Sequence, residues 1–184
     1  MKKRIAMISV HTCPLAASEG KETGGMNVYV MELSRQLAEE DFIVDIFTRS
    51  QDEDQPKIVK VSENLRVIHL KAGPEKYIHK KKLFDYLPEF IDSFINFQKT
   101  GNLNYDLIHA HYYLSGLVGL VIKKNKSLPL IINFHTLALM KNLVARDELE
   151  KEEKERINAE IKLAENADRI IASSKNEMEY LKYL

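Results

Sequence analysis

Short apolar runs alternate with longer stretches of helical periodicity along the whole chain. Runs typical of strands cover residues 5–10, 42–48, 65–70, 106–109, 128–134 and 169–172. Between them, apolar residues recur every three or four positions in residues 26–40, 80–99, 112–124, 147–166 and 174–183. Strands that alternate with helices are typical of βαβ units around a parallel sheet. We therefore predict one α/β domain over residues 1–184, with a doubly wound, mainly parallel, Rossmann-like sheet.

The same periodicity predicts which side of each helix faces the core. The expected apolar faces are Val28, Met31, Leu33 and Leu37 within residues 26–40, and a thin stripe of Ile157, Ile161 and Ala164 within residues 147–166. Residues 112–124 are nearly all apolar, which predicts a helix that is buried on most sides. The charged run 148–155 is expected to be the solvated start of its helix.

Charge and cysteine content exclude several classes of protein. The 27 basic residues balance 27 acidic ones, so no overall field favours nucleic acid, and an anion would need a local cluster. No apolar run approaches the roughly 20 residues that span a bilayer. The apolar run behind Lys2 and Lys3 has no small-residue cleavage site after it, so we expect a strand and not a signal peptide. The single cysteine, Cys13, is expected to be a small buried hydrophobe in a cytoplasmic protein.

Ligands of doubly wound sheets bind beyond the carboxyl ends of the strands, so the loops after the strands are the places to search. Gly24 and Gly25 follow the first such loop, at the start of a helix. Glycines permit positive φ and a close approach of backbone N–H groups, and a helix N-terminus favours phosphate. The pair is neither a P-loop nor a G-x-G-x-x-G motif, and taken alone it is explained slightly better by a tight turn without a ligand.

Two histidines and two tyrosines follow the strand predicted at residues 106–109. Alternation places His109 and His111 on one face of the strand, with Ala110 and Tyr112 on the other. A zinc site would need a third ligand at suitable spacing, and the motif supplies none. We therefore expect no metal site and a buried, hydrogen-bonded His109.

Further polar groups come from three separate segments. The strand predicted at residues 128–134 is followed by His135 and Thr136, whose imidazole and hydroxyl can hydrogen-bond a polyol or a phosphate oxygen. Basic residues stand at 80–82, all lysine, and at Arg156. Runs of charge usually lie on a solvated surface, and we expect this of Lys81 and Lys82.

Six blocks occur in a fixed order along the chain: Gly-Gly-Met-Asn-Val-Tyr-Val, Ala-Gly-Pro followed by lysines, Asp-Leu-Ile-His-x-His-Tyr-x-Leu-Ser-Gly, Phe-His-Thr-Leu-Ala-x-x-Lys-Asn, Arg-x-x-x-Glu and Ala-Asp-Arg-Ile-Ile. Together they resemble the N-terminal, acceptor-binding domain of the GT-B-fold retaining glycosyltransferases of family 4. The nearest branches are the inositol-phosphate N-acetylglucosaminyltransferases of mycothiol synthesis and the sucrose-phosphate synthases. The resemblance covers residues 11–174 and implies one half of a two-domain enzyme, with the C-terminal donor-binding domain absent from this chain.

The resemblance also implies roles for single residues. Gly25 would approach the donor diphosphate, with Gly24 allowing the turn, and His135 would be the catalytic residue beside the anomeric carbon. The implied acceptor-binding residues are Asn27, which would face the acceptor, and Lys80, Tyr112, Thr136 and Arg156, which would hold its phosphate. Lys81 would replace Lys80 if the loop were shifted by one position.

The implied reaction moves a sugar from a nucleotide-diphosphate sugar to a phosphorylated polyol or hexose, with inositol phosphate favoured over fructose 6-phosphate. The nucleotide sugar is the donor substrate, and no cofactor is implied. The family uses a front-face mechanism whose cationic and acidic groups lie in the C-terminal domain, so we expect the chain alone to be inactive. Two alternatives stay open: a stand-alone Rossmann-like binding module without catalysis, and an interaction protein that uses the charged helix at residues 147–166.

Overall fold

A computed structural model of the chain describes residues 2–16, 24–148 and 150–182. The strands are β1 (Arg4–Ile8), β2 (Ile43–Arg49), β3 (Ile58–Lys60), β4 (Leu65–Leu70), β5 (Leu107–His111), β6 (Leu130–Asn133) and β7 (Arg169–Ile171). The helices are α1 (Gly25–Glu39), α2 (Leu87–Thr100), α3 (Tyr113–Lys126), α4 (Ala138–Val144), α5 (Lys154–Asn166) and α6 (Lys175–Leu181), with short 3-10 turns at Lys80–Lys82 and Phe84–Tyr86. The strands expected from the sequence are all present, with ends shifted by a few residues, whereas β3 and α4 were not predicted.

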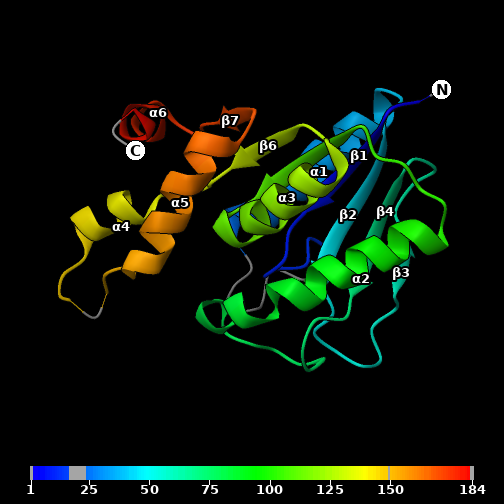
Figure 1. Cartoon of the computed structure of the whole chain (residues 1–184), viewed down its shortest axis with the longest axis horizontal. Coiled ribbons are helices and arrows are strands. Elements are labelled where there is room, and N and C mark those ends of the chain that lie inside the picture. Colours follow the sequence, from blue (N-terminus) through cyan, green and yellow to red (C-terminus); the bar gives the residue numbers. More distant parts are fainter. Residues whose placement is uncertain (1, 17–23, 149, 183–184) are drawn as a thin grey trace.

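The strands form a single twisted sheet (Figure 1). Their order is β3-β4-β2-β1-β5-β6-β7, and every neighbouring pair is parallel except β3 with β4. The chain runs outward from β1 through β2 to β4 and then returns to add β5 on the other side of β1. The prediction of a doubly wound, mainly parallel α/β sheet is therefore confirmed.

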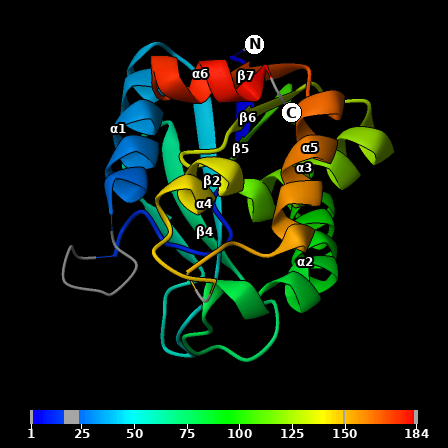
Figure 2. The same cartoon turned by 90° about the vertical axis from the view of Figure 1, so that its left-hand side faces the viewer.

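Helices cover both faces of the sheet (Figure 2). On one face, α1 packs over Met7, Val44 and Ile46. On the other, α2, α3 and α5 pack over a larger cluster that includes Ile8 and Phe47. Neighbouring strand residues point to opposite faces, so a strand that is covered on both sides must be apolar at nearly every position. This explains why β1 appears in the sequence as a continuous apolar run.

The buried face of α1 differs from the predicted one. Its buried residues are Asn27, Val30, Met31, Ser34 and Ala38. Val28, which was expected on this face, is 65% exposed. The Asn27 amide can be buried because its oxygen accepts a hydrogen bond from Thr12 Oγ1 at 2.8 Å and its nitrogen donates one to the Cys13 carbonyl at 3.2 Å. A hydrophobic pattern cannot reveal a polar residue that finds such partners.

The helix α5 also departs from its prediction. It begins at Lys154, and its buried positions are Arg156, Ala159, Glu160 and Leu163, whereas the predicted stripe of Ile157, Ile161 and Ala164 is only half-buried. Arg156 Nε donates to Glu160 Oε1 at 2.7 Å, one helical turn away. The two charges are buried as a pair, which makes their burial tolerable.

Two glycines bring α3 close to the sheet. A Cβ on Gly116 would lie 2.7 Å from Leu163 of α5 and 2.9 Å from Ile132 of β6, and one on Gly119 would lie 2.7 Å from Leu130 of β6. Such distances are too short for any larger residue without a shift of its neighbours. The expectation that this helix is buried on most sides is confirmed, and its N-terminus is fixed at the carboxyl edge of the sheet.

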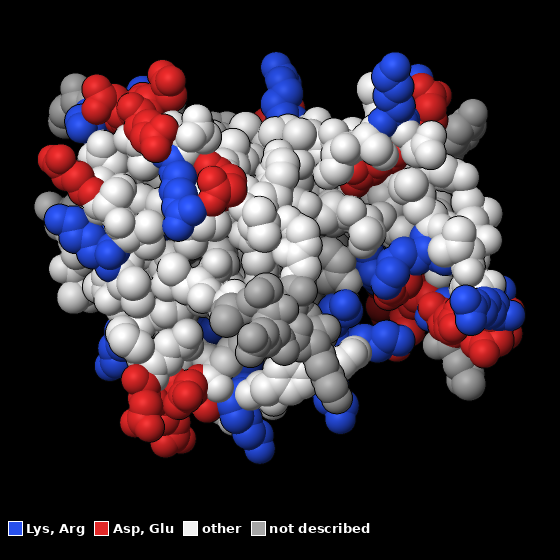
Figure 3. All heavy atoms as spheres, turned by 180° about the vertical axis from the view of Figure 1, so that it is seen from behind, with Lys and Arg blue, Asp and Glu red and all other residues white. Residues whose placement is uncertain are grey.

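Charges of both signs are spread over the surface. On the face shown in Figure 3, groups of Lys and Arg side chains alternate with groups of Asp and Glu around the rim. That face therefore carries no broad field of one sign, as the balanced composition predicts. Among the helices of the described residues, none combines the length and apolar character that crossing a bilayer requires.

Candidate functional site

The point where the strand order reverses lies between β1 and β5, and the loops after these two strands meet there. His11 follows β1 and Tyr112 follows β5. Their rings are in contact, with centroids 4.5 Å apart. In open α/β sheets this crevice is the usual ligand site. The fold thus places a predicted acceptor-binding residue, Tyr112, at the position where a ligand is expected.

Arg156 joins Tyr112 to Thr136 at this edge. Its guanidinium lies over the Tyr112 ring, 4.8 Å from the centroid, and its Nη2 donates to the carbonyl of Thr136 at 2.7 Å and to the hydroxyl at 3.2 Å. The side chain is 3% exposed, so Arg156 is not one of the solvated charges of its helix. Burial opposes the charge, but Tyr112, Glu160 and Glu152 outweigh it and raise the pKa of Arg156. Three of the predicted acceptor-binding residues are thus in direct contact.

The backbone at Tyr112 and His135 is held in a conformation that L-residues rarely adopt. Tyr112 has φ 74° and ψ 156°, and His135 has φ 63°. The Tyr112 N–H donates to the Asn133 carbonyl at 2.8 Å, and its carbonyl accepts from the Gly116 N–H at 3.0 Å, which fixes this turn at the start of α3. Such conformations cost about 1–3 kcal/mol each and are concentrated at functional sites. Both positions follow strand ends at the same edge.

His135 is held by a second histidine. His111 Nδ1 lies 2.9 Å from His135 Nε2, and His111 Nε2 lies 2.8 Å from the sulfur of Met7. A thioether can only accept, so the proton of neutral His111 is on Nε2 and its Nδ1 accepts from His135 Nε2. This assignment leaves His135 Nδ1 as an acceptor. Burial, with a smaller contribution from His109, lowers the pKa of His135 to about 4, so the ring is neutral at physiological pH.

Lys80 lies in the 3-10 turn Lys80–Lys82, and its charge acts on His11. Burial, with smaller contributions from the positive charges of Lys80 and Arg156, lowers the pKa of His11 to about 3. The charges of Lys80 and Arg156 therefore both act on the imidazole that contacts Tyr112. His11 Nδ1 is buried and has no hydrogen-bond partner among the described residues.

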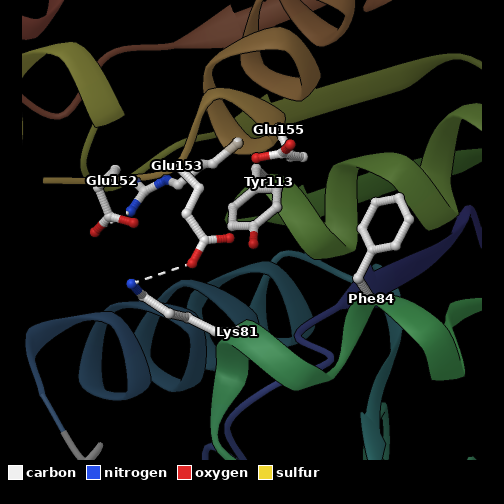
Figure 4. A pocket seen from close by; sticks show the side chains of 7 residues that line it. Lys81, Phe84, Tyr113, Glu152, Glu153 and Glu155 are labelled. Atoms are coloured by element: carbon white, nitrogen blue, oxygen red, sulfur yellow. Dashed lines mark ion pairs between the residues drawn. The ribbon is translucent and has the colours of Figure 1, made fainter.

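A cavity of about 190 Å³ lies beside this cluster (Figure 4). Its lining residues are Lys81, Phe84, Tyr113, Glu152, Glu153, Glu155 and Arg156. Lys81 points across it to Glu153, with Nζ and Oε1 3.4 Å apart. Lys81 therefore lines a cavity next to the predicted phosphate-binding residues.

The two glycines begin α1, and the space in front of them is open. Gly24 caps the helix with φ −145° and ψ −172°, an extended conformation that is accessible to any residue, so the turn makes no use of the positive φ that a glycine permits. A Cβ on Gly24 or Gly25 would meet no atom of the described residues within 4 Å. The residues just before them, 17–23, lie outside the described part of the chain. Asn27, predicted to face the acceptor, has both amide atoms bonded to the loop after β1.

His109, His111 and Cys13 are buried and contact other buried side chains. His109 and His111 share one strand face, with ring centroids 4.5 Å apart, and His109 Nε2 is 2.7 Å from Asn133 Oδ1, so both expectations for His109 are confirmed. Cys13 is buried beside His69, and burial raises the pKa of its thiol. Within the described ranges, no three His, Cys, Asp or Glu residues are grouped to hold a metal ion.

Sequence reasoning overlooked three residues of this site. His11 was inside the first strand-end loop, but a single histidine gives no further signal. Glu160 was part of the Arg-x-x-x-Glu block, yet its bond to the Ala138 N–H, 2.8 Å long at the start of α4, depends on the fold. Glu152 stood within a charged run and shows no distinguishing pattern. Each is recognised only by what it contacts.

Comparison with known proteins gives a consistent result. The model of Glycosyltransferase Family 4 matches residues 23–183. A D-inositol 3-phosphate glycosyltransferase of Corynebacterium glutamicum (strain R) is 40% identical over 97% of this chain and 43% of its own length, and one of Corynebacterium aurimucosum is 42% identical over 95% and 41%. The structure of a sucrose-phosphate synthase from Thermosynechococcus elongatus superposes with a TM-score of 0.92 at 36% identity, over 99% of this chain and 45% of that one.

The chain spans about two fifths of the length of the curated relatives that it matches. The match to the family model nevertheless includes both glycines, both strained turns and the Arg156 cluster. Sequence, fold and the arrangement of the site lead to one conclusion: this chain belongs to Glycosyltransferase Family 4.

Proposed function

We propose that this chain is the acceptor-binding N-terminal domain of a retaining glycosyltransferase that moves a sugar from a nucleotide-diphosphate sugar to a phosphorylated polyol or hexose. Inositol phosphate is the preferred acceptor, because several curated relatives bear the name D-inositol 3-phosphate glycosyltransferase. Fructose 6-phosphate is the second choice, in view of the similarity to a sucrose-phosphate synthase. The donor-binding domain lies outside this chain, and we expect the protein to work in the cytoplasm.

The observation that carries the proposal is the Arg156 cluster beside His135. A buried guanidinium, the Thr136 hydroxyl and the Tyr112 ring meet at the carboxyl edge of the sheet. A phosphate monoester carries about 1.5–2 negative charges at neutral pH and three acceptor oxygens, which this cluster and Lys80 would bind. The overall charge of the chain is balanced, so the selectivity for an anion must come from this local group.

His135 would act on the donor sugar. Its neutral ring keeps Nδ1 as an acceptor for a sugar hydroxyl, while His111 holds the ring in place. The strained turn fixes the direction of its backbone carbonyl, which would stabilise positive charge at the anomeric carbon as the diphosphate leaves. The open N-terminus of α1 at Gly24 and Gly25 would receive the diphosphate through backbone N–H groups.

The test is a kinetic comparison of lysine and arginine variants in the full-length protein. Lys80→Ala and Arg156→Lys should raise KM for the phosphorylated acceptor about ten- to a hundredfold, because a charge-assisted hydrogen bond contributes about 1.5–3 kcal/mol. Arg156→Lys keeps the charge but loses the planar fork that reaches Thr136 and Glu160 together. Lys82→Ala is the matched control, since Lys82 is an exposed lysine of the same turn.

Each outcome decides something different. A KM that rises with the phosphorylated acceptor and stays constant with its unphosphorylated analogue ties Lys80 and Arg156 to the phosphate. A constant KM in both variants would make them structural residues and remove the proposed acceptor site. Substituting His135 should mainly lower kcat, because its contact strengthens as charge develops.

A further inference from the structure

The cations around the cavity are already paired with carboxylates. Glu152 Oε1 lies 2.9 Å from Arg156 Nη1, and the same oxygen contacts Lys141 Nζ. Lys81 is paired with Glu153 across the cavity (Figure 4). An acceptor phosphate would therefore meet a guanidinium whose charge is balanced by a neighbour. This competition bears directly on how tightly the site can hold an anion.

Glu152 is fixed in a way that distinguishes it from the other glutamates of the cavity. Its side chain is 10% exposed, against 61% for Glu153. Its backbone N–H donates to Asn142 Oδ1 at 2.7 Å, which holds the segment before α5 against the end of α4. Burial alone would raise the pKa of Glu152, but Lys141 and Arg156 outweigh it and lower the pKa, so the side chain is ionised at neutral pH.

The Arg156 nitrogen that faces Glu152 has bonding capacity left. Nε donates to Glu160 and Nη2 to Thr136, both with good geometry. Nη1 is buried and lies 2.9 Å from Glu152 Oε1, but its N–H groups are not well aligned with that oxygen for a hydrogen bond. A buried N–H group without a hydrogen bond is costly, so this nitrogen gains most from a well-aligned oxyanion. Lys141 Nζ reaches the same point from α4.

We propose that Lys141 and Arg156 Nη1 form an anion subsite in which Glu152 is an internal competitor of the acceptor phosphate. The inference rests on the proposed acceptor site and identifies Lys141 as a further member of it. When phosphate binds, one of its oxygens takes the place of the Glu152 carboxylate between the two cations. The internal carboxylate keeps the cations paired without a ligand and limits how tightly free phosphate binds.

The experiment measures binding of inorganic phosphate to this chain by titration calorimetry. Glu152→Gln preserves shape but removes the charge, and it should bind phosphate about tenfold more tightly, the equivalent of about 1.4 kcal/mol. Glu153→Gln is the matched control. Because the pair of Glu153 with Lys81 is exposed, this substitution should change the affinity for phosphate by less than about threefold. In the Glu152→Gln background, Lys141→Met should abolish most of the gain. A thermal unfolding curve for each variant verifies that it is folded.

The outcomes separate this inference from the proposed function. If Glu152→Gln binds phosphate as wild type does or more weakly, Glu152 positions Arg156 and does not compete, which overturns the inference and leaves the acceptor site standing. If Glu153→Gln gives the same gain as Glu152→Gln, the effect is one of general charge and the subsite is refuted. If Arg156→Lys leaves phosphate binding unchanged in both backgrounds, or no variant binds phosphate, both the subsite and the proposed acceptor site are wrong.

Discussion

Replacing Arg156 should lower the stability of the domain as well as the affinity for an acceptor. The side chain is 3% exposed, and the Glu160 carboxylate that it bonds at 2.7 Å is fully buried. In Arg156→Ala that carboxylate keeps only the Ala138 N–H among its hydrogen bonds in the structure. Removing one partner of a buried pair costs about 3–5 kcal/mol. We expect a loss of about 3 kcal/mol, at the low end of that range, because Glu160 can take up a proton.

Protonation of Glu160 in Arg156→Ala gives a second, independent prediction, which concerns the pH dependence of stability. Burial already raises the pKa of Glu160 despite the neighbouring Arg156, and without the arginine it should rise further. When the pKa of a carboxyl group is higher in the folded than in the unfolded protein, the free energy of unfolding decreases as the pH rises between the two pKa values. The stability deficit of Arg156→Ala should therefore be smaller in mildly acidic buffer than at neutral pH.

Urea unfolding of the 184-residue chain, followed by circular dichroism, measures both effects. The double variant Arg156→Ala/Glu160→Gln is the control, because it removes the uncompensated charge and should recover much of the loss at neutral pH. A loss below about 1 kcal/mol, or a deficit that Glu160→Gln does not change, would contradict the buried-pair interpretation. A loss below about 1 kcal/mol would also mean that Arg156→Ala can serve as a simple probe of binding, whereas we expect Arg156→Lys to perturb the fold less.

Three further predictions follow from the contacts. Asp45→Asn should cost about 3–5 kcal/mol of unfolding free energy, because this fully buried carboxylate accepts from two arginines and a tyrosine; a loss under about 1 kcal/mol in urea would refute that. The pKa of His135 falls from 6.5 to about 4 on folding, so the unfolded chain binds an extra proton in that window and stability should drop as the pH falls through it. His135→Asn should lose that part of the pH dependence, and unfolding curves that vary with pH as in wild type would contradict it. Gly25→Ala should leave stability within about 1 kcal/mol, since its Cβ meets no described atom, yet lower transfer by the full-length enzyme about tenfold or more; unchanged kinetics would exclude a close approach of the donor.

Much of the fold could be predicted because the sheet is buried on both faces. The strands β1, β2 and β5 are buried at nearly every position and contain more apolar than polar residues, so each includes an apolar run that can be recognised in the sequence. The edge strand β3 could not be predicted in this way, because it has only three residues, which are exposed or half-buried and form no long apolar run. The buried faces of α1 and α5 were misjudged for a related reason: both include polar residues that are satisfied by distant partners.

The class of the fold, the alternation of strands and helices and the family could all be predicted from the sequence alone, because they depend on local periodicity and on blocks of contiguous residues. It also placed Tyr112, His135 and Thr136 after strand ends, where a parallel sheet brings loops to one edge. The contacts around Arg156 could be found only in the folded chain. Arg156 is buried against Tyr112 and Thr136, Glu160 balances its charge, and Glu152 and Lys141 meet at its remaining nitrogen. Arg156 and Thr136 are 20 residues apart, and their contact depends on how α5 packs against α3 and α4. A charge in a charged helix gives no local sign of being buried, since its burial is a property of the partners that the fold brings to it.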